Sequence, residues 1–577
     1  MVDLKTNPFY LSDTEVRHIE GILSGMSADE KIGQILCPSL STFDPAMTEY
    51  YTKTLHLGSV MVRPFEREEL RENLAKLQAQ SAIPLLVAAN LENGGAGALL
   101  DGTLYANPMG CAAAGDPEFG YRLGKISCRE AGSCGVNWAF APIVDIDSNY
   151  HNPITNTRTF GSDPDTVLSF AKGYVRAAEE ENVACSVKHF PGDGQDERDQ
   201  HLLVSVNGLS LEEWEKGYGK IYRAMIGCGV LSVMAAHIAA PRVAKDLCPG
   251  VSEEEAHYPA SQSRILLGNL LRERLSFNGV IVTDSTLMVG YMQKLPRREA
   301  LARTIESGAD MILFSRSLEE DVRYLRAALE DGRLSGGRLD DAVRRILAMK
   351  MKLGLFADRG DKPVSRPVLK ETEAWTKECA RKAVTLVKDT RGILPLSPEK
   401  TPRIYLNVIE TAPDNRSRFA AEIRDRLRRE GFAVTLRRRK YPFDPAKITL
   451  SNFTPQVDRA LKEVFCTTDE FVGKYDLAVL VFNMKTASNN TVVRVNWNVL
   501  FGMGNDLPWY SGEMPVLGIS FANPYHLLDA PMCHAFVNAY TDNAATVDAV
   551  FEKITGRDSF QGVSPSDPFC GRSDTKV

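Results

Sequence analysis

The sequence lacks the features that mark disulfide-bonded, zinc-binding or membrane-spanning chains. Its eleven cysteines are scattered singly and no two are spaced as C-x-x-C, so neither a disulfide framework nor a zinc site is predicted. The first 27 residues are polar and charged without the apolar core of a signal peptide, and no apolar run reaches membrane-spanning length. These absences favour a cytoplasmic protein with no membrane partner.

The sequence also has little excess charge of either sign. It contains 68 Lys and Arg against 74 Asp and Glu, and the net charge of −6 argues against general nucleic-acid binding. One basic stretch, 424–440, alternates with apolar residues at core-like spacing and is interpreted as a solvated helix face and strand edge. With 577 residues, of which 44% are hydrophobic, the chain is long enough for two or three domains with cores of their own.

What is present is a repeated alternation of short apolar runs with amphipathic stretches. Continuous apolar strands that alternate with helices are typical of a parallel sheet buried on both faces. Eight such units in roughly 350 residues predict an α/β fold of the (β/α)8 TIM-barrel type. The eight apolar runs are Ile32–Leu40, Gly58–Val62, Ile83–Asn90, Val136–Ile146, Val183–Phe190, Gly229–Ile238, Gly279–Ser285 and Asp310–Ser315.

A second domain is predicted after the barrel. An amphipathic helix over 342–356, with a glycine stop at Gly354, is expected to end a barrel domain of residues 1–356. A Pro- and charge-rich linker, 357–375, separates it from a second α/β pattern, which predicts an α/β/α sandwich over 376–577. The expected elements there are a helix over 415–431 and strands over 403–409, 432–437, 477–484, 515–521 and 535–540.

Polar residues stand where the predicted barrel strands end. The active site of a TIM barrel lies at the carboxyl ends of its strands, so these side chains are candidates for chemistry. A mouth with cations, imidazoles and carboxylates suits a polar, hydroxyl-rich or anionic ligand. The alternative for any single residue is that it only closes a layer of the barrel. The candidates are Asn90, Glu92, Asp145, Asp147, Arg158, Lys188, His189, His237, Asp284 and Ser315.

The fifth strand leads into the most distinctive stretch of the chain. Lys188 and His189 end this strand, and Pro191 and two glycines then turn the backbone into a polar loop. The loop carries Asp199 and His201, two residues apart, so the carboxylate can orient the imidazole. A hinged loop of this kind would let the imidazole swing in after a substrate binds.

Several ordered motifs resemble one enzyme family. Lys188–Gly194 reads K-H-F-P-G-D-G and is followed after four residues by Asp199-Gln200-His201; the family segment reads K-H-F-P-G-H-G, four residues, then D-S-H. Gly279–Asp284 reads G-V-I-V-T-D, as in the nucleophile segment of the family. Further likeness lies at 26–34, 140–142, 158–161 and 520–525. The chain therefore resembles glycoside hydrolase family 3, in its β-N-acetylglucosaminidase branch.

The resemblance implies a retaining, exo-acting glycosidase that releases terminal β-linked N-acetylglucosamine. It makes Asp284 the nucleophile that forms a covalent glycosyl-Asp intermediate, and His201, oriented by Asp199, the acid/base. It implies no metal and no organic cofactor. The expected partner is a carbohydrate (a GlcNAc glycoside, chitin oligosaccharide or muropeptide), and the expected state a monomer or homodimer. The predicted sugar-binding residues are Arg158, Lys188, His189, Glu92 and His237.

Two departures from the family pattern keep other activities open. The family D-x-E-G-G-R after strand three reads Asn90-Leu91-Glu92-Asn93-Gly94-Gly95-Ala96, so its Arg is missing and its Asp is replaced. The His of P-G-H-G is Asp193, an added carboxylate, which favours hydrolysis over attack by phosphate. The alternatives are a phosphorylase of the same family, a β-glucosidase-type member and, more remotely, a catalytically silent sugar-binding protein.

A metal-dependent hydrolase barrel is a further alternative, because such barrels also place His and Asp at strand ends. The first predicted strand, however, ends in Cys37-Pro38-Ser39-Leu40 and lacks an H-x-H pair. The sequence therefore favours a metal-free mechanism.

Overall fold

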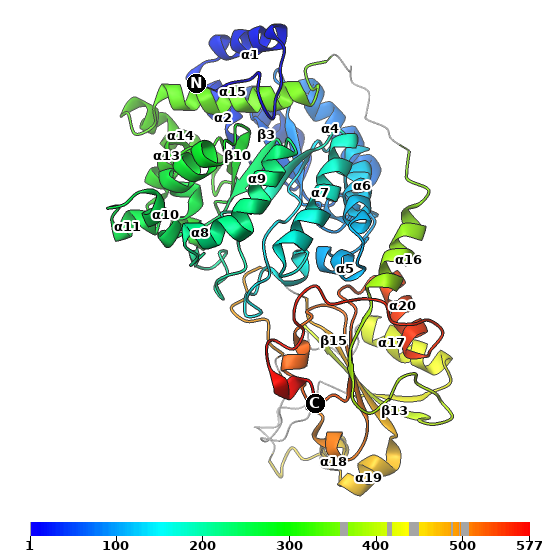
Figure 1. Ribbon diagram of the computed structural model, residues 1–577. Helices are drawn as coiled ribbons and strands as arrows, with labels where there is room; N and C mark the ends of the chain where they lie inside the picture. Colours follow the sequence, from blue (N-terminus) through cyan, green and yellow to red (C-terminus); the bar gives the residue numbers. More distant parts are fainter. Residues whose placement is uncertain are drawn as a thin grey trace. The chain divides into compact units, whose positions relative to one another are not determined.

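The fold is taken from a computed structural model, which describes residues 2–357, 367–411, 418–437, 449–464, 466–485, 488–495, 497 and 507–577. Contacts divide the chain into two compact units. The first unit comprises Met1–Ala112, Asp116–Trp375 and a short later stretch that ends at Thr491. The second unit comprises Ala113–Gly115 and the rest of the chain from Thr376 onward. Figure 1 colours the chain from blue to red in this order. The domain bounds expected from the sequence stay a prediction.

The first unit is built on a parallel sheet in the order β1-β11-β10-β8-β6-β5-β4-β3-β2. Each of the eight predicted apolar runs contributes to it, so the barrel prediction is confirmed. Their strands are β1 (Leu36–Cys37), β2 (Ser39–Leu40), β3 (Ser59–Val62), β4 (Leu86–Ala89), β5 (Trp138–Ala139), β6 (Ala184–Phe190), β8 (Ser232–Ala235), β10 (Val280–Ser285) and β11 (Met311–Leu313).

The first run supplies both edges of this sheet. β1 and β2 lie on either side of Pro38, which has no N–H to donate to a neighbouring strand. β1 pairs with β11 through Leu36 and Ile312, whereas β2 pairs with β3 through Leu40 and Val62. One short segment therefore joins the end of the sheet to its beginning and nearly closes the barrel.

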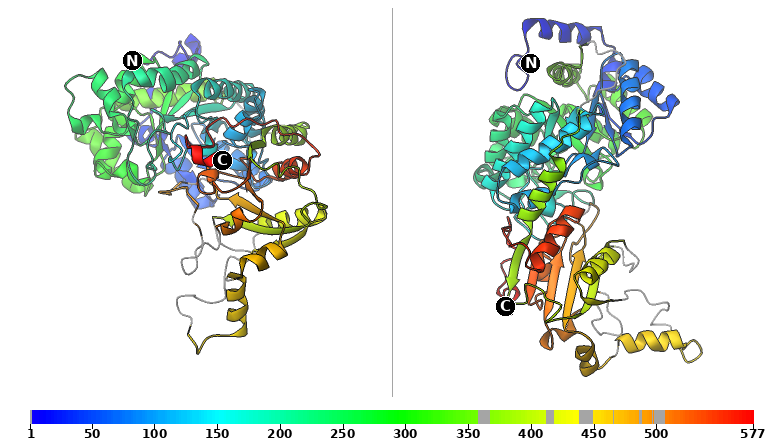
Figure 2. Two further views of the ribbon diagram at one scale, coloured as in Figure 1. Left: turned by 60° about the horizontal axis from the view of Figure 1, so that its bottom comes forward. Right: turned by 90° about the vertical axis from the view of Figure 1, so that its right-hand side faces the viewer.

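Helices surround the barrel strands (Figures 1 and 2). α6 and α7 approach closely because glycines line their contact: a Cβ at Gly120 would lie 2.5 Å from the carbonyl oxygen of Phe170. The helices of this unit are α1 (Asp13–Gly25), α2 (Ala28–Gln34), α3 (Pro45–Glu49), α4 (Arg67–Gln80), α5 (Pro108–Ala113), α6 (Glu118–Gly132), α7 (Pro164–Glu180), α8 (Leu211–Trp214), α9 (Lys220–Gly227), α10 (Pro241–Leu247), α11 (Glu253–Ala256), α12 (Val289–Met292), α13 (Arg297–Glu306), α14 (Leu318–Glu330) and α15 (Gly336–Lys352).

The helix predicted over 342–356 is the C-terminal part of α15, and both predicted ends were wrong. The helix begins at Gly336 because the side chain of Ser335 accepts a hydrogen bond from the N–H of Arg338 and caps it. Two glycines at the start hid this beginning from a propensity argument. The helix ends at Lys352, two residues before Gly354, whose φ of 67° lies in the left-handed region.

The second unit contains a sheet in the order β12-β17-β16-β15-β13-β14. All pairings are parallel except that of β12 with β17. The sequence did not predict β12, because it is a short run that follows a helix directly and ends in Lys-Asp. The strands are β12 (Thr385–Asp389), β13 (Arg403–Glu410), β14 (Ala433–Leu436), β15 (Leu477–Asn483), β16 (Val516–Ser520) and β17 (Ala535–Asn538); the helices are α16 (Thr372–Ala383), α17 (Arg418–Arg429), α18 (Pro455–Val464), α19 (Thr468–Lys474) and α20 (Ala544–Ile554).

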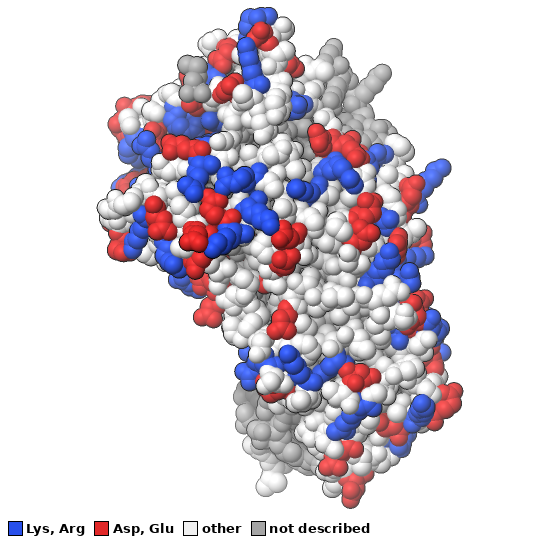
Figure 3. Space-filling model, in the orientation of Figure 1, with Lys and Arg blue, Asp and Glu red and all other residues white. Residues whose placement is uncertain are grey.

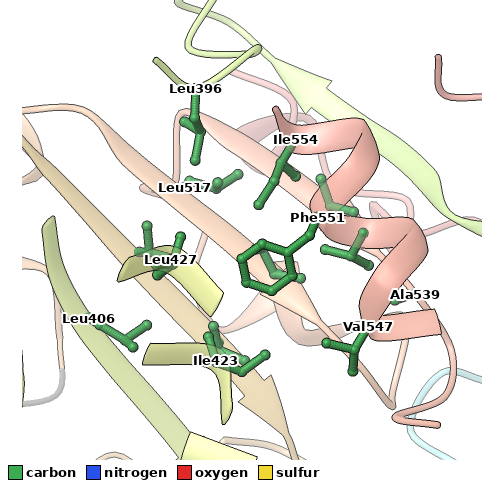
Figure 4. Close-up of a cluster of buried hydrophobic side chains, with 14 of the residues drawn as sticks. Leu396, Leu406, Ile423, Leu427, Leu517, Ala539, Val547, Phe551 and Ile554 are labelled. Atoms are coloured by element: carbon green, nitrogen blue, oxygen red, sulfur yellow. The ribbon is translucent and has the colours of Figure 1, made fainter. Parts of the chain in front are cut away.

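Both faces of this second sheet are covered. Successive side chains of a strand point to opposite faces. In β15, Leu477, Val479 and Val481 pack in one core with residues of α17 and α20. Figure 4 shows the side chains that α17 and α20 contribute to this core. The alternate residues of β15 pack in a second core with Phe471 of α19 and with Tyr510. The α/β/α sandwich predicted from the sequence is therefore confirmed.

The charged residues form no single-sign surface on the face shown in Figure 3, where acidic and basic side chains are interspersed. Part of the predicted linker 357–375 and the end of the basic stretch 424–440 lie outside the described residues. The last predicted linker residues, from Thr372 onward, are helical in α16. None of the described helices combines the length and apolar character that crossing a bilayer requires.

Candidate active site

Asp284 lies near the end of β10, where the strand presents its carboxylate beside three imidazoles. Its Oδ2 lies 4.0 Å from Nε2 of His189, and its Oδ1 accepts a hydrogen bond from the N–H of Ser285 at 2.7 Å. Burial alone would raise the pKa of Asp284, but His189, His237 and His201 outweigh that effect and hold the pKa below its usual value. The carboxylate is therefore ionised at neutral pH, as a nucleophile requires.

Two of these imidazoles are held by partners within the barrel. Nδ1 of His189 lies 2.7 Å from Oδ2 of Asp145, which leaves Nε2 facing Asp284. His237 is bonded at both ring nitrogens: Nε2 donates to the carbonyl of Ser285, and Nδ1 accepts from the hydroxyl of Ser261, each at 2.9 Å. Burial lowers the pKa of His237, and the charge of Asp284 and the hydrogen bond to Ser285 act against this shift.

The third imidazole belongs to the pair expected from the sequence. Nδ1 of His201 lies 2.6 Å from Oδ1 of Asp199, and the same oxygen accepts from the N–H of His201 at 2.9 Å. Burial would raise the pKa of Asp199, but these hydrogen bonds and the charge of His201 hold it below its usual value. Because an ionised carboxylate binds Nδ1–H, Nε2 is left to meet a ligand.

The loop that carries this pair is tied down on two sides. The N–H of Val289 donates to the carbonyl of His201 at 3.0 Å, which links the loop to the segment after β10. The N–H of Asn489, from the stretch that groups with the first unit, donates to Oδ2 of Asp199 at 2.6 Å. The free swing expected for a hinged loop is therefore restrained by backbone hydrogen bonds.

A second charged group lies across the carboxyl ends of β4 and β6. Glu92 accepts two hydrogen bonds from Arg158, at 2.9 and 3.0 Å, and one from Nζ of Lys188 at 2.7 Å. Burial would raise the pKa of Glu92, but these cations lower it strongly. The result is a fixed carboxylate between two cations, an arrangement suited to binding ring hydroxyls.

The chain is similar to several proteins that are named as carbohydrate enzymes. The model of the glycosyl hydrolase family 3 N-terminal domain matches residues 27–349. A β-N-acetylglucosaminidase/β-glucosidase from Cellulomonas fimi is 39% identical over 587 residues and covers 100% of both chains. The solved structure titled "Beta-glucoside phosphorylase BglX bound to 2FGlc" is similar with a TM-score of 0.89, 40% identity and 99% coverage of both chains. The chain belongs to glycoside hydrolase family 3.

A third relative shows the fold alone. The family 3 β-N-acetylglucosaminidase from Paenibacillus sp. str. FPU-7 has a TM-score of 0.74 at 24% identity and covers 94% of this chain and 99% of its own. Together with the arrangement of the two sheets, this likeness supports a fold in which a barrel is followed by a sandwich unit.

The structure brings the predicted site residues of this family 3 enzyme into two groups. Asp284, His189, His201 and His237 are close enough for their charges to interact, and Asp199 adjoins His201. Glu92, Arg158 and Lys188 form the other group. Of the predicted sugar-binding residues, His237 uses both ring nitrogens within the protein and therefore supports the strand beside Asp284.

Two supporting residues, Ser261 and Asn489, were not predicted as part of the site. Asp145, which orients His189, is one of the predicted strand-end candidates, and that position is its only sequence signal. Ser261 and Asn489 lie 24 and 290 residues from their partners, and no motif marks them. Among the described residues, no group of three or more His, Cys, Asp or Glu is arranged to hold a metal ion.

Proposed function

We propose that this enzyme cleaves terminal β-linked glucosides or N-acetylglucosaminides with retention, acting from the end of its substrate. The observation that carries the proposal is Asp284, a partly buried carboxylate beside three imidazoles at the end of a barrel strand and beside the Asp199–His201 pair. A retaining mechanism needs a fixed carboxylate on one side of the anomeric carbon and a proton donor at the leaving oxygen.

In the first step, a carboxylate oxygen of Asp284 attacks the anomeric carbon as the glycosidic C–O bond breaks. The electron pair of that bond moves to the leaving oxygen, which takes a proton from Nε2 of the His201 imidazolium. In the second step, neutral His201 takes a proton from water while the water oxygen attacks the anomeric carbon and releases Asp284. Asp199 holds the ring in place by accepting from Nδ1 at 2.6 Å.

The sugar is held by the Glu92 group. Its carboxylate is fixed by Arg158 and Lys188 and stands at the position of the Glu in the family D-x-E-G-G-R segment. Carboxylates and neighbouring cations bind hydroxyls by charge-assisted hydrogen bonds, which glucose and N-acetylglucosamine both offer. A panel of aryl β-glycosides separates the two: turnover of neither sugar would refute this assignment, and the ratio of their kcat/KM values defines the specificity.

The covalent intermediate provides the direct test. Incubation with a 2-deoxy-2-fluoro β-glucoside carrying a dinitrophenolate is expected to add one sugar residue to the protein mass. Peptide mapping is expected to place it on Asp284, within β10. An enzyme that turns over without an adduct, or one labelled at another carboxylate, contradicts the assignment of Asp284.

A second candidate function is transfer of the sugar to phosphate. A carboxylate in the acid/base position would repel an incoming phosphate by about 1 to 4 kcal/mol at contact distance, and the imidazole of His201 removes that repulsion. The relative of 40% identity titled a β-glucoside phosphorylase favours the same outcome. Asp193 opposes it less than the sequence suggested, because burial and Asp145 raise the pKa of this carboxyl to about 7.

Products resolved by NMR across a phosphate titration at constant ionic strength test this candidate. A sugar 1-phosphate whose share rises with phosphate concentration supports phosphorolysis. Free sugar alone, at a rate that does not change with phosphate, makes the enzyme a hydrolase only.

A further inference from the structure

Asp193 is a buried carboxyl group that the proposed mechanism does not use. It stands on the turn after β6 and is only 2% exposed. Its backbone N–H donates to Oδ1 of Asp145 at 2.8 Å, so its position is set by the carboxylate that orients His189. The backbone of Asp193 therefore lies beside the end of β6 to which we assign sugar binding.

From there the side chain of Asp193 turns toward the loop of the acid/base pair. Its Oδ1 accepts from Nδ2 of Asn152 at 2.9 Å, and the same Nδ2 donates to the carbonyl of Asp196 at 2.8 Å. Its Oδ2 faces Nε2 of Gln200 at 3.5 Å, the long end of hydrogen-bond range. Two amide side chains thus connect this one carboxyl group to residues 196 and 200 of the loop.

Gln200 lies between Asp199 and His201 and cannot reverse its amide freely. Its Oε1 accepts from the backbone N–H of His237 at 2.9 Å, which fixes Nε2 toward Asp193. The ring of His237 in turn donates to the carbonyl of Ser285, the residue after Asp284. A continuous set of hydrogen bonds therefore runs from Asp193 through Gln200 to the strand of the nucleophile.

We propose that Asp193 is a positioning residue that fixes the Asp199–His201 loop through Gln200 and so aligns the acid/base with Asp284. It touches no substrate. Its effect is confined to the step in which His201 delivers a proton. This inference rests on the proposed function of His201 and adds the residue that places it.

The test is the dependence of kcat/KM on the leaving group. Asp193→Asn keeps an oxygen for Asn152 but turns an amide N–H toward Nε2 of Gln200, so two donors face each other. For a methyl β-glycoside, whose leaving group needs a proton, kcat/KM is expected to fall by about tenfold or more. For the 2,4-dinitrophenyl glycoside of the same sugar, which needs none, the fall is expected to stay within about threefold.

A double variant tests whether the effect passes through Gln200. In Asp193→Asn with Gln200→Glu, the new carboxylate accepts from both the new amide and the N–H of His237, and the net charge is unchanged. It is expected to recover most of the loss on the methyl glycoside. Equal losses on both leaving groups in Asp193→Asn, or no recovery in the double variant, would overturn the proposal.

Two further variants keep the result interpretable. Gln200→Met removes the same contact from the loop side and can replace Asp193→Asn if that variant fails to fold. It is expected to lose more kcat/KM on the methyl glycoside than on the dinitrophenyl glycoside. Equal losses on the two substrates in Gln200→Met overturn the proposal. His201→Ala serves as the reference. If the kcat/KM loss in His201→Ala does not depend on the leaving group, the acid/base assignment fails and the proposal for Asp193 fails with it. If the loss depends on the leaving group in His201→Ala but not in the other variants, only the role assigned to Asp193 is rejected.

Discussion

At the scale of single residues, His201 and Asp199 differ in what they contribute to the same proton transfer. His201→Ala removes the acid and is expected to lower kcat/KM for a methyl glycoside by about 100-fold or more, with little change for a dinitrophenyl glycoside. Asp199→Asn keeps the ring but replaces the carboxylate that accepts from Nδ1 at 2.6 Å, so it should show the same pattern in milder form. The measurement is kcat/KM on both substrates; equal losses on the two would make His201 structural.

Loss of Glu92 should weaken binding of the sugar and leave the proton transfer by His201 unchanged. Glu92→Gln removes a charge that two cations hold, and about 1.5 to 3 kcal/mol of hydrogen bonding to the sugar corresponds to roughly a 10- to 150-fold lower kcat/KM. The loss should be equal for both leaving groups, because the sugar and not the proton is affected. Glu72→Gln, at an exposed position of α4, is the matched control. A leaving-group dependence in Glu92→Gln would contradict sugar binding.

The sequence predicted the reacting groups better than their supports. Asp284 and His201 are marked by strand ends and by motifs with fixed spacing. Asp145 is a strand-end candidate, but its role as the partner of His189, 44 residues away, has no local signal. Ser261 lies 24 residues from His237, and no motif marks it. The raised pKa of Asp193 also depends on burial and on the neighbouring Asp145, which only the fold brings together.

At the scale of elements, the acid/base loop rests against the segment after β10. A Cβ at Gly290 would lie 2.4 Å from the carbonyl oxygen of Gln200 and 3.0 Å from that of Leu203, both backbone atoms. Gly290→Ala is therefore expected to displace the loop and lower kcat/KM for the methyl glycoside by about tenfold or more, with a smaller effect on the dinitrophenyl glycoside.

Gly208→Ala is the control for this prediction. It lies just beyond the same loop, and nothing lies within 4 Å of its added Cβ. It should leave both activities within about twofold of the parent. If Gly290→Ala behaves like Gly208→Ala, the two segments are not coupled.

The elements themselves were largely predictable because barrel strands are continuous apolar runs. Each of the eight predicted apolar runs contributes to the barrel sheet. Element ends were not, since they depend on single contacts such as the cap that Ser335 gives to α15. β12 was missed because an antiparallel edge strand of five residues carries a weak pattern and is stabilised by pairing with β17, about 150 residues away.

At the scale of the whole molecule, one buried cation limits stability. Lys350 of α15 is fully buried, and its Nζ donates to Oε1 of Gln34 at 2.6 Å. Burial lowers the pKa of Lys350 to about 7, well below its value in an unfolded chain. Such a shift corresponds to a cost on the order of 5 kcal/mol when the folded group is charged.

The sign of the pH dependence follows from proton binding. Between about pH 7 and pH 10 the unfolded chain binds a proton at Lys350 that the folded chain does not, so this term makes the parent more stable as pH rises. Lys350→Met is therefore expected to raise Tm at pH 6 and to raise it less at pH 9. Lys352→Met, on an exposed position of the same helix, is the control. A Tm lowered equally at both pH values would show that the ammonium group stabilises the fold.

The way the barrel closes has a consequence for its synthesis on the ribosome. β1 emerges among the first residues, yet its partner β11 is made about 275 residues later, since Leu36 pairs with Ile312. Until then the nascent sheet carries two open edges with unpaired N–H and C=O groups, which are templates for pairing with other chains. Chains truncated before Met311 should therefore aggregate, whereas chains that continue through β11 and α15 can bury both edges within one molecule.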